Sequence, residues 1–373
     1  MSTIRSATAG TVEYISNMER EPLRATESGI RHIQYRLPHN TTRTNTSTAF
    51  VFSGGGARGA LHVGALRALL QAGIHPDMVV GTSIGAWNAA WLARMPTLDG
   101  VEALADVWYG LQPQQVLLGR KRPIGSRLAR IRALHALLML TALRRIAGGS
   151  SSLYSDAGLR QILTQHLADT TFDELALPCS VIATDLSHGG RAVFHRGPVV
   201  DALLASSAIP GIFPPVRING SMYADGGMVD GCSVETAVEM GARRIFVLAI
   251  GYDADADAGA LWSRAAEHTA EPAHALSRRS VSAVIQRASQ VMGNYQIERA
   301  MERVPAGVEV HLISLSPGSS SGSGSLSFGN VSRWIESAYN STRAYLDAVA
   351  CARSPRNTHS EECLEPAECM LSA

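Results

Sequence analysis

Two glycine-rich segments constrain this chain more than any other feature of its sequence. They are Gly54-Gly55-Gly56-Ala57-Arg58-Gly59 and Gly81-Thr82-Ser83-Ile84-Gly85. Each follows a short apolar run that is typical of a strand, and each precedes a run with helical spacing of its apolar residues. This order of strand, glycine loop and helix, repeated once, predicts a parallel sheet with both loops at the same carboxyl edge.

The second segment has the form G-x-S-x-G, a tight strand-to-helix turn that exposes a serine hydroxyl. In so sharp a turn, a Cβ atom at Gly81 or Gly85 would clash with neighbouring backbone. We therefore expect Ser83 to act as a nucleophile. Because so short a pattern also occurs by chance, an ordinary strand-to-helix turn is the alternative.

The first segment places free backbone N–H groups at a helix N-terminus, which suits a developing oxyanion. The same residues also satisfy G-x-G-x-x-G, the dinucleotide-binding fingerprint, which requires an acidic residue at the end of the second strand. Here the second predicted strand, Met78–Val80, runs into the serine turn instead. We therefore expect an oxyanion hole and no nucleotide cofactor. The residues of that predicted hole are Gly54, Gly55, Gly56, Ala57, Arg58 and Gly59.

A nucleophilic serine needs a base, and the chain offers lysine and histidine candidates. A lysine base would be Lys121, which lies in a basic run that we expect to face solvent. A histidine that follows an acid in the chain would be His268, His274 or His311. The first two fall in a polar, helix-like region and the third falls inside a predicted strand, which favours structural or surface roles.

The remaining candidate base is Asp225. It follows the segment Arg217–Tyr223, which is typical of a hairpin that turns at Asn-Gly. Gly226 and Gly227 let the backbone bend away directly after the carboxylate, so the carboxylate can approach another loop closely. The alternative is that Asp225 only stabilises its own turn.

Together these blocks, in this order and spacing, resemble those of patatin-like phospholipases. The segments Ala183–Leu186, Ala205–Pro210 and Phe213–Pro215 resemble further family blocks, and the similarity covers roughly residues 48–350. The resemblance implies an α/β fold of three layers, α/β/α, with a mostly parallel central sheet. It further implies a lipid acyl hydrolase of phospholipase A, lysophospholipase or esterase type, acting on phospholipids or other acyl lipids.

The resemblance also implies a Ser-Asp dyad without histidine, in which Ser83 attacks and Asp225 accepts its proton. The oxyanion would bind backbone N–H groups near Gly55 and Gly56, and Arg58 would help to fix the loop. After Gly227 the chain departs from the family pattern, which usually continues towards an Asn-x-Pro-like turn. Two alternatives stay open: an acyltransferase that uses the same acyl-serine, and a non-catalytic lipid-binding protein of the same fold.

Composition narrows the class of protein further. The chain has 373 residues, of which 46% are hydrophobic and 17% charged, with a net charge of +1. This balance favours a globular protein and argues against nucleic acid as the main partner. The five cysteines lack paired metal spacing, and nothing resembles a calcium loop, so we expect no metal. Reduced thiols and the absence of a signal-like or membrane-spanning run predict a cytoplasmic protein, and the alternative is export by a route without a cleavable signal.

We expect one hydrolase domain, residues 47–352, between a disordered N-terminal arm, 1–46, and a disordered tail, 353–373. An insertion at about 115–149 interrupts the domain. Within it, residues 117–147 carry arginines interleaved with leucines and no acidic residue. Such a basic amphipathic stretch predicts peripheral contact with an anionic membrane, and the alternative is a helix packed on the core with solvated arginines.

Overall fold

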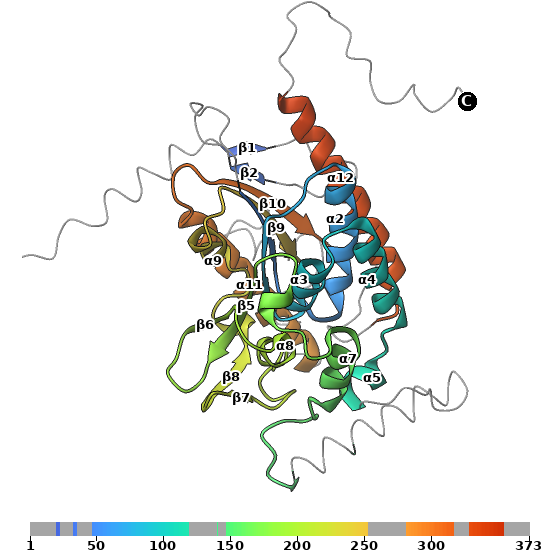
Figure 1. Ribbon diagram of the computed structural model, residues 1–373, viewed down its shortest axis with the longest axis vertical. Coiled ribbons are helices and arrows are strands. Elements are labelled where there is room, and N and C mark those ends of the chain that lie inside the picture. Colours follow the sequence, from blue (N-terminus) through green and yellow to red (C-terminus); the bar gives the residue numbers. More distant parts are fainter. Residues whose placement is uncertain are drawn as a thin grey trace, which may run out of the picture.

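The computed structural model describes residues 47–118, 140, 147–252, 281–316 and 328–353, together with two short N-terminal strands. These residues form a ten-stranded sheet with helices on both faces (Figure 1). Its central strands are neighbours in the order β10-β9-β3-β4-β5 and all run parallel. Their bounds are β3 (Thr48–Phe52), β4 (Met78–Thr82), β5 (Cys179–Asp185), β9 (Arg244–Ile250) and β10 (Glu309–Leu315).

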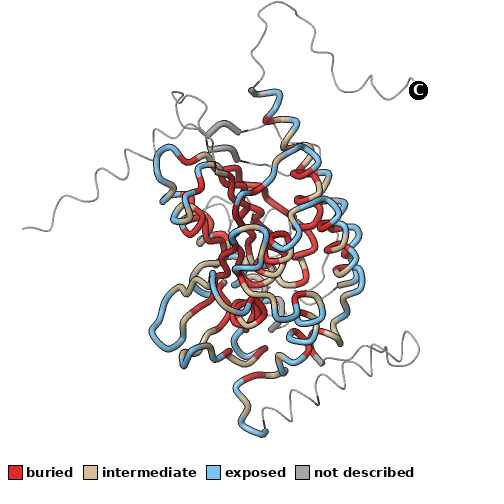
Figure 2. Tube along the Cα trace, in the orientation of Figure 1, coloured by how far each residue is buried: buried red, intermediate tan, exposed pale blue. Residues whose placement is uncertain are grey.

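The central strands are apolar along their whole length because both of their faces are covered. Every residue of β3 and β4 is buried, as Figure 2 shows for the middle of the sheet. Phe50 and Phe52 of β3 face one core, whereas Ala49 and Val51 face the other. An apolar run without alternation is the expected signature of such a strand. The predicted three-layer α/β/α arrangement is confirmed.

The helices divide between the two faces. Contacts in the first core come from α2 (Ala60–Gln71), α3 (Ile84–Arg94), α4 (Leu98–Gly110), α5 (Pro113–Leu118), α7 (Ala157–Leu167), α8 (Val199–Ser206) and α12 (Val331–Arg353). The second core is covered by α9 (Val234–Glu239) and α11 (Val281–Glu302). Three short 3-10 turns complete the described elements: η1 (Gly56–Gly59), η2 (Phe172–Glu174) and η3 (Gly226–Met228).

Antiparallel strands complete the sheet beyond β5. They are β6 (Arg191–Phe194), β7 (Val216–Ile218) and β8 (Ser221–Asp225). The β7–β8 hairpin turns at Asn219 and Gly220, whose φ angles are 49° and 88°. Positive φ at both central residues defines the tight hairpin turn that Asn-Gly favours. The predicted hairpin at this position is therefore confirmed.

Several predictions concern segments that lie largely outside the described residues. Within the predicted arm 1–46, β1 (Arg20–Pro22) pairs with β2 (Ile33–Tyr35), and β2 joins β10. The rest of that arm, most of the basic stretch 117–147 and the tail from 354 are not described, so their expected behaviour stays a prediction. Among the described helices, none is both long and apolar enough to cross a bilayer.

Candidate active site

Ser83 occupies a sharp turn between β4 and α3. Its φ of 55° and ψ of −126° lie outside the ordinary regions for a residue with a Cβ atom, so the turn holds local strain. A Cβ atom on Gly81 would lie 2.5 Å from the Ala86 Cα, and one on Gly85 would lie 2.4 Å from the Phe52 carbonyl oxygen. Both glycines therefore allow α3 to begin directly against the backbone of β3 and β4.

The hydroxyl of Ser83 donates a hydrogen bond of 2.6 Å to Oδ2 of Asp225. Both residues are buried, with exposed fractions of 8% and 7%. The other carboxylate oxygen of Asp225, Oδ1, accepts a hydrogen bond of 2.8 Å from the Gly227 N–H. The backbone of Asp225 is held as well, because its carbonyl accepts from the Thr184 hydroxyl at 2.7 Å and its N–H donates to Ala208 at 3.0 Å.

Strand register explains how two residues so distant in the chain meet. Thr82, the last residue of β4, pairs with Ile182 of β5, and Asp225, the last residue of β8, pairs with Ala183. Because β6 occupies the opposite edge of β5 at both positions, β4 and β8 share one edge and run towards each other. The serine and the aspartate thus lie where two strands of opposite direction end face to face.

Burial changes the chemistry of the Asp225 carboxyl. Desolvation raises the pKa of Asp225 from its ordinary value of 3.8 to about 6, although the hydrogen bonds from Ser83 and Gly227 oppose the shift. At neutral pH the carboxylate remains ionised, and it is a stronger base than an aspartate in water. This pKa suits a group that must accept a proton from an alcohol.

The glycine loop lies beside Ser83. A Cβ atom on Gly54 would lie 3.6 Å from the Ser83 Cβ. The Gly54 N–H already donates to the Gly231 carbonyl at 3.1 Å, and Gly56 has a φ of 59°. Of the N–H groups in the predicted oxyanion hole, that of Gly54 is therefore occupied. Gly55 and Gly56, the positions that the family resemblance indicates, follow directly.

The side chain of Arg58 contacts the backbone of this loop. Its Nε donates to the Gly55 carbonyl oxygen over 3.4 Å. Burial lowers the pKa of the Arg58 guanidinium, since the charged form has lost much of its water. A Cβ on Gly251 would lie 3.2 Å from Nη1 of Arg58, so the guanidinium also packs against the chain that leaves β9.

Neither Ser83 nor Asp225 hydrogen-bonds a histidine within the described part of the chain. His311, the candidate within β10, stacks on Phe246 at 4.4 Å, and its Nδ1 lies 2.7 Å from the Tyr345 hydroxyl. His268, His274 and Lys121 lie outside the described residues. The structure thus places His311 in a core contact and away from the serine.

A second buried histidine, His62 of α2, contacts α3, the helix that follows the serine turn Gly81–Gly85, which we call the elbow. Its Nε2 lies 3.2 Å from the Leu248 carbonyl, and its Nδ1 lies 3.0 Å from the Asn88 side-chain amide. Burial lowers the pKa of His62 to about 3, so the ring is neutral. Asn88 also donates to the Gly59 carbonyl at 2.9 Å, which ties α3 to the end of the glycine loop.

Sequence reasoning missed the role of Ser206, although this serine lies in a segment that resembles a family block. Its hydroxyl accepts a hydrogen bond of 2.8 Å from the Ser83 N–H and donates one of 2.5 Å to the Ile182 carbonyl. One side chain thereby fixes the elbow against β5. The family resemblance alone does not reveal this role, because the partners of Ser206 lie far away in the chain.

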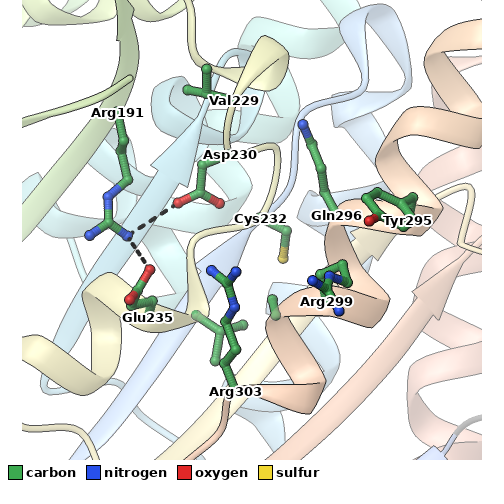
Figure 3. Close-up of a pocket in the computed structure, with 11 residues that line it drawn as sticks. Arg191, Val229, Asp230, Cys232, Glu235, Tyr295, Gln296, Arg299 and Arg303 are labelled. Atoms are coloured by element: carbon green, nitrogen blue, oxygen red, sulfur yellow. Dashed lines mark hydrogen bonds and ion pairs between the residues drawn. The ribbon is translucent and has the colours of Figure 1, made fainter. Parts of the chain in front are cut away.

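A cavity of about 490 Å³ lies behind the loop that follows Asp225, between that loop and α11 (Figure 3). Arg191 on its wall pairs with Asp230 at 3.4 Å, Glu235 at 3.1 Å and Glu239 at 3.0 Å. The backbone of this loop is tied to β4, because the Thr82 hydroxyl donates to the Asp230 carbonyl at 2.9 Å. In the described part of the chain, no three His, Cys, Asp or Glu side chains group as metal ligands.

Relatives of this chain carry longer sequences. Patatin-like phospholipase domain-containing protein 7 of Rattus norvegicus is 27% identical over 210 residues, which cover 56% of this chain and 14% of that protein. Protein ZK370.4 of Caenorhabditis elegans, named for the same domain, is 30% identical over 210 residues with the same shares. Lysophospholipase NTE1 of Mycosarcoma maydis is 26% identical over 205 residues, 55% of this chain and 10% of the relative. The chain thus spans about a seventh or less of the length of these relatives.

Among solved structures, VipD from Legionella pneumophila aligns with 89% of this chain and 71% of its own, at a TM-score of 0.42 and 16% identity. The match to a protein family is more direct. Residues 50–238 match the patatin-like phospholipase family, a stretch of just over half the chain that includes both Ser83 and Asp225. This chain belongs to the patatin-like phospholipase family.

Proposed function

We propose that this chain is a serine lipid acyl hydrolase that works through a Ser83–Asp225 dyad. The observation that carries the proposal is the hydrogen bond of 2.6 Å between the Ser83 hydroxyl and the buried Asp225 carboxylate. Nucleophile and base within hydrogen-bond reach, with the base itself oriented, are the signature of an activated nucleophile. The names of the relatives support an ester bond in a phospholipid or lysophospholipid as the substrate.

Acylation begins with the attack of Ser83 Oγ on the acyl carbonyl carbon while the hydroxyl proton passes to Asp225 Oδ2. The carbonyl electron pair moves onto oxygen, and the resulting oxyanion accepts hydrogen bonds from the N–H groups of Gly55 and Gly56. Such donors lower the barrier by about 3 kcal/mol each. The carbonyl then re-forms, the ester C–O bond breaks, and the leaving alkoxide takes the proton from Asp225.

Deacylation repeats the same steps with water. A water molecule attacks the acyl-serine and gives one proton to Asp225, which returns it to Ser83 Oγ as the fatty acid leaves. Every proton thus moves through one carboxyl group. The raised pKa of this group makes it a better proton acceptor than an aspartate in water. If a lipid alcohol replaces water, the same acyl-serine yields an acyl transfer in place of hydrolysis.

The test is labelling by a fluorophosphonate probe, which reacts only with an activated serine. We expect wild type to label, and we expect Ser83→Ala and Asp225→Asn to remain unlabelled. If Asp225→Asn labels like wild type, the dyad is wrong. If folded wild type does not label in the presence of phospholipid vesicles, the chain is a lipid-binding protein instead. Product analysis with and without an added lipid alcohol separates the hydrolase from the acyltransferase.

The same proposal includes peripheral contact between residues 117–147 and an anionic membrane in the cytoplasm. The basic and leucine-rich composition of that stretch supports it. We expect replacement of its arginines by glutamine to weaken sedimentation with vesicles that contain anionic lipid. Equal sedimentation of the variant and wild type would contradict this contact.

A further inference from the structure

Gln296 of α11 reaches with both ends of its side-chain amide into the loop that follows Asp225. Its Oε1 accepts a hydrogen bond of 2.9 Å from the Gly231 N–H, and its Nε2 donates one of 3.1 Å to the Gly227 carbonyl. A backbone donor on one side and a backbone acceptor on the other leave only one orientation of the amide that satisfies both. The side chain therefore bridges the two ends of the loop between Gly227 and Gly231.

Each of the two glycines that Gln296 binds is in turn hydrogen-bonded to one half of the candidate active site. The Gly227 N–H donates to Asp225 Oδ1 at 2.8 Å, so the residue whose carbonyl Gln296 binds also contacts the candidate base. The Gly231 carbonyl accepts a hydrogen bond of 3.1 Å from the Gly54 N–H, so the second glycine that Gln296 binds contacts the glycine loop. One side chain thus connects the loop of the base with the loop that lies beside the nucleophile.

The surroundings of Gln296 fit this connecting role. A Cβ atom on Gly231 would lie 2.6 Å from the Gln296 Oε1, so the close approach depends on glycine at that position. Gln296 is half-buried on the wall of the cavity behind the loop, whereas its neighbours Tyr295 and Arg299 are exposed (Figure 3). It also lies beyond residues 50–238, the stretch that matches the family.

We propose that Gln296 is a positioning residue for the hydrolase, one that sets the Asp225 loop and the Gly54 loop relative to each other through Gly227 and Gly231. This inference rests on the proposed function. Neither hydrogen bond reaches the substrate, so Gln296 acts on the rate of the chemical step and not on lipid binding. Displacement of a base or an oxyanion donor by about 1 Å can slow such a step about a hundredfold.

The experiment compares three variants in the full chain. Gln296→Met removes both hydrogen bonds at nearly constant volume, and Gln296→Glu keeps an acceptor for Gly231 but loses the donor to Gly227. Arg299→Met is the matched control, because it places the same side chain three residues further along α11, where wild-type Arg299 pairs with Glu302 at 2.8 Å. The readouts are the rate of fluorophosphonate labelling, kcat, KM, the unfolding midpoint, and hydrogen exchange of peptides that cover 53–59 and 226–233.

For Gln296→Met we expect labelling and kcat to fall about tenfold at a KM within twofold of wild type. Exchange should accelerate in both peptides while the unfolding midpoint stays close to that of Arg299→Met. The Gln296→Glu variant should fall between Gln296→Met and wild type, and Arg299→Met should match wild type. A pH profile whose acid limb moves in Gln296→Met but not in Arg299→Met would further support a positioning role.

Two outcomes would overturn the inference. One is equal labelling and exchange in Gln296→Met and Arg299→Met. The other is a loss of activity that accompanies faster exchange across the whole domain, since that marks a general loss of stability. If wild type itself does not label, the proposed function fails, and the exchange data alone then decide whether Gln296 holds the two loops.

Discussion

The backbone N–H of Ser83 donates to the hydroxyl of Ser206, over a distance of 2.8 Å. This contact has a consequence for the chemistry, because the nucleophile's own amide is already occupied. The Ser83 N–H is therefore not available to stabilise an oxyanion on the substrate carbonyl, and other N–H groups must do so. The glycine loop, whose Gly54 lies against the Ser83 side chain, is the segment placed to supply them.

We first predict that Ser206→Ala loosens the elbow. The buried Ser83 N–H and the Ile182 carbonyl both lose a partner, so the free energy of unfolding should fall by about 1–3 kcal/mol. Fluorophosphonate labelling should slow about tenfold. Ser207→Ala is the control, since its hydroxyl accepts from the Trp87 indole at 2.8 Å and does not touch the elbow. Wild-type labelling by Ser206→Ala would refute this role.

A second prediction concerns the pH dependence of hydrolysis. The pKa of Asp225 is raised to about 6, chiefly by desolvation, and only the ionised carboxylate accepts the serine proton. We therefore expect kcat/KM to rise with pH through an apparent pKa of about 6 and then to level off. The measurement is a pH–rate profile on an uncharged short-chain ester. An acid limb near pH 4 would show that the base titrates as an ordinary solvated carboxylate.

The same pKa predicts a stability cost for the base. Between about pH 4 and pH 6 the folded protein binds a proton at Asp225 that the unfolded chain has released, so stability falls as pH rises through that window. Above it the full cost, about 2–3 kcal/mol, remains. The Asp225→Asn variant, which we expect to be inactive, should therefore be more stable than wild type at pH 8 by roughly that amount. The gain should vanish below about pH 4 in urea unfolding at each pH, and a gain independent of pH would contradict the assignment.

The fourth prediction compares a glycine of the serine turn, Gly85, with a glycine at a helix end, Gly110. A Cβ atom on Gly85 would lie 2.4 Å from the Phe52 carbonyl, whereas one on Gly110, at the end of α4, would meet nothing within 4 Å. We expect Gly85→Ala to lower the free energy of unfolding by about 3 kcal/mol or more, because backbone must shift. Gly110→Ala should be neutral or stabilising by up to about 1 kcal/mol. Thermal and urea unfolding of both variants decide the matter.

Much of the fold could be predicted because local patterns agree with it. Residues Ile84–Arg94 form the helix that the helical spacing after the serine segment predicts, because the serine turn starts it and apolar spacing defines its buried face. The hairpin at Asn219 and Gly220 follows from two residues that tolerate positive φ. Both signals reside within a few neighbouring residues, which is the range that sequence patterns cover.

The candidate site was harder to predict from the sequence, because its contacts join distant segments. Residue types alone left Asp225 and several histidines open as bases, and only the family resemblance selected the aspartate. Ser206 lies 123 residues from Ser83, and Gln296 lies 65 residues from Gly231. Gln296 belongs to no motif, and the family block around Ser206 does not reveal which groups its hydroxyl binds. Their roles emerge only when the sheet brings the segments together.

Because β4 and β8 both pair with the same edge of β5, their register on β5 sets the distance between Ser83 and Asp225. A shift of β8 along β5 that keeps its side chains on the correct faces must be two residues, which displaces Asp225 by about 7 Å. No such misregistered sheet would retain a hydrogen bond of 2.6 Å to Ser83. During refolding, labelling competence should therefore return only when β5 has paired with both strands in register, later than collapse of the chain. Fluorophosphonate labelling of Ser83 should thus report when the strands have reached their native register.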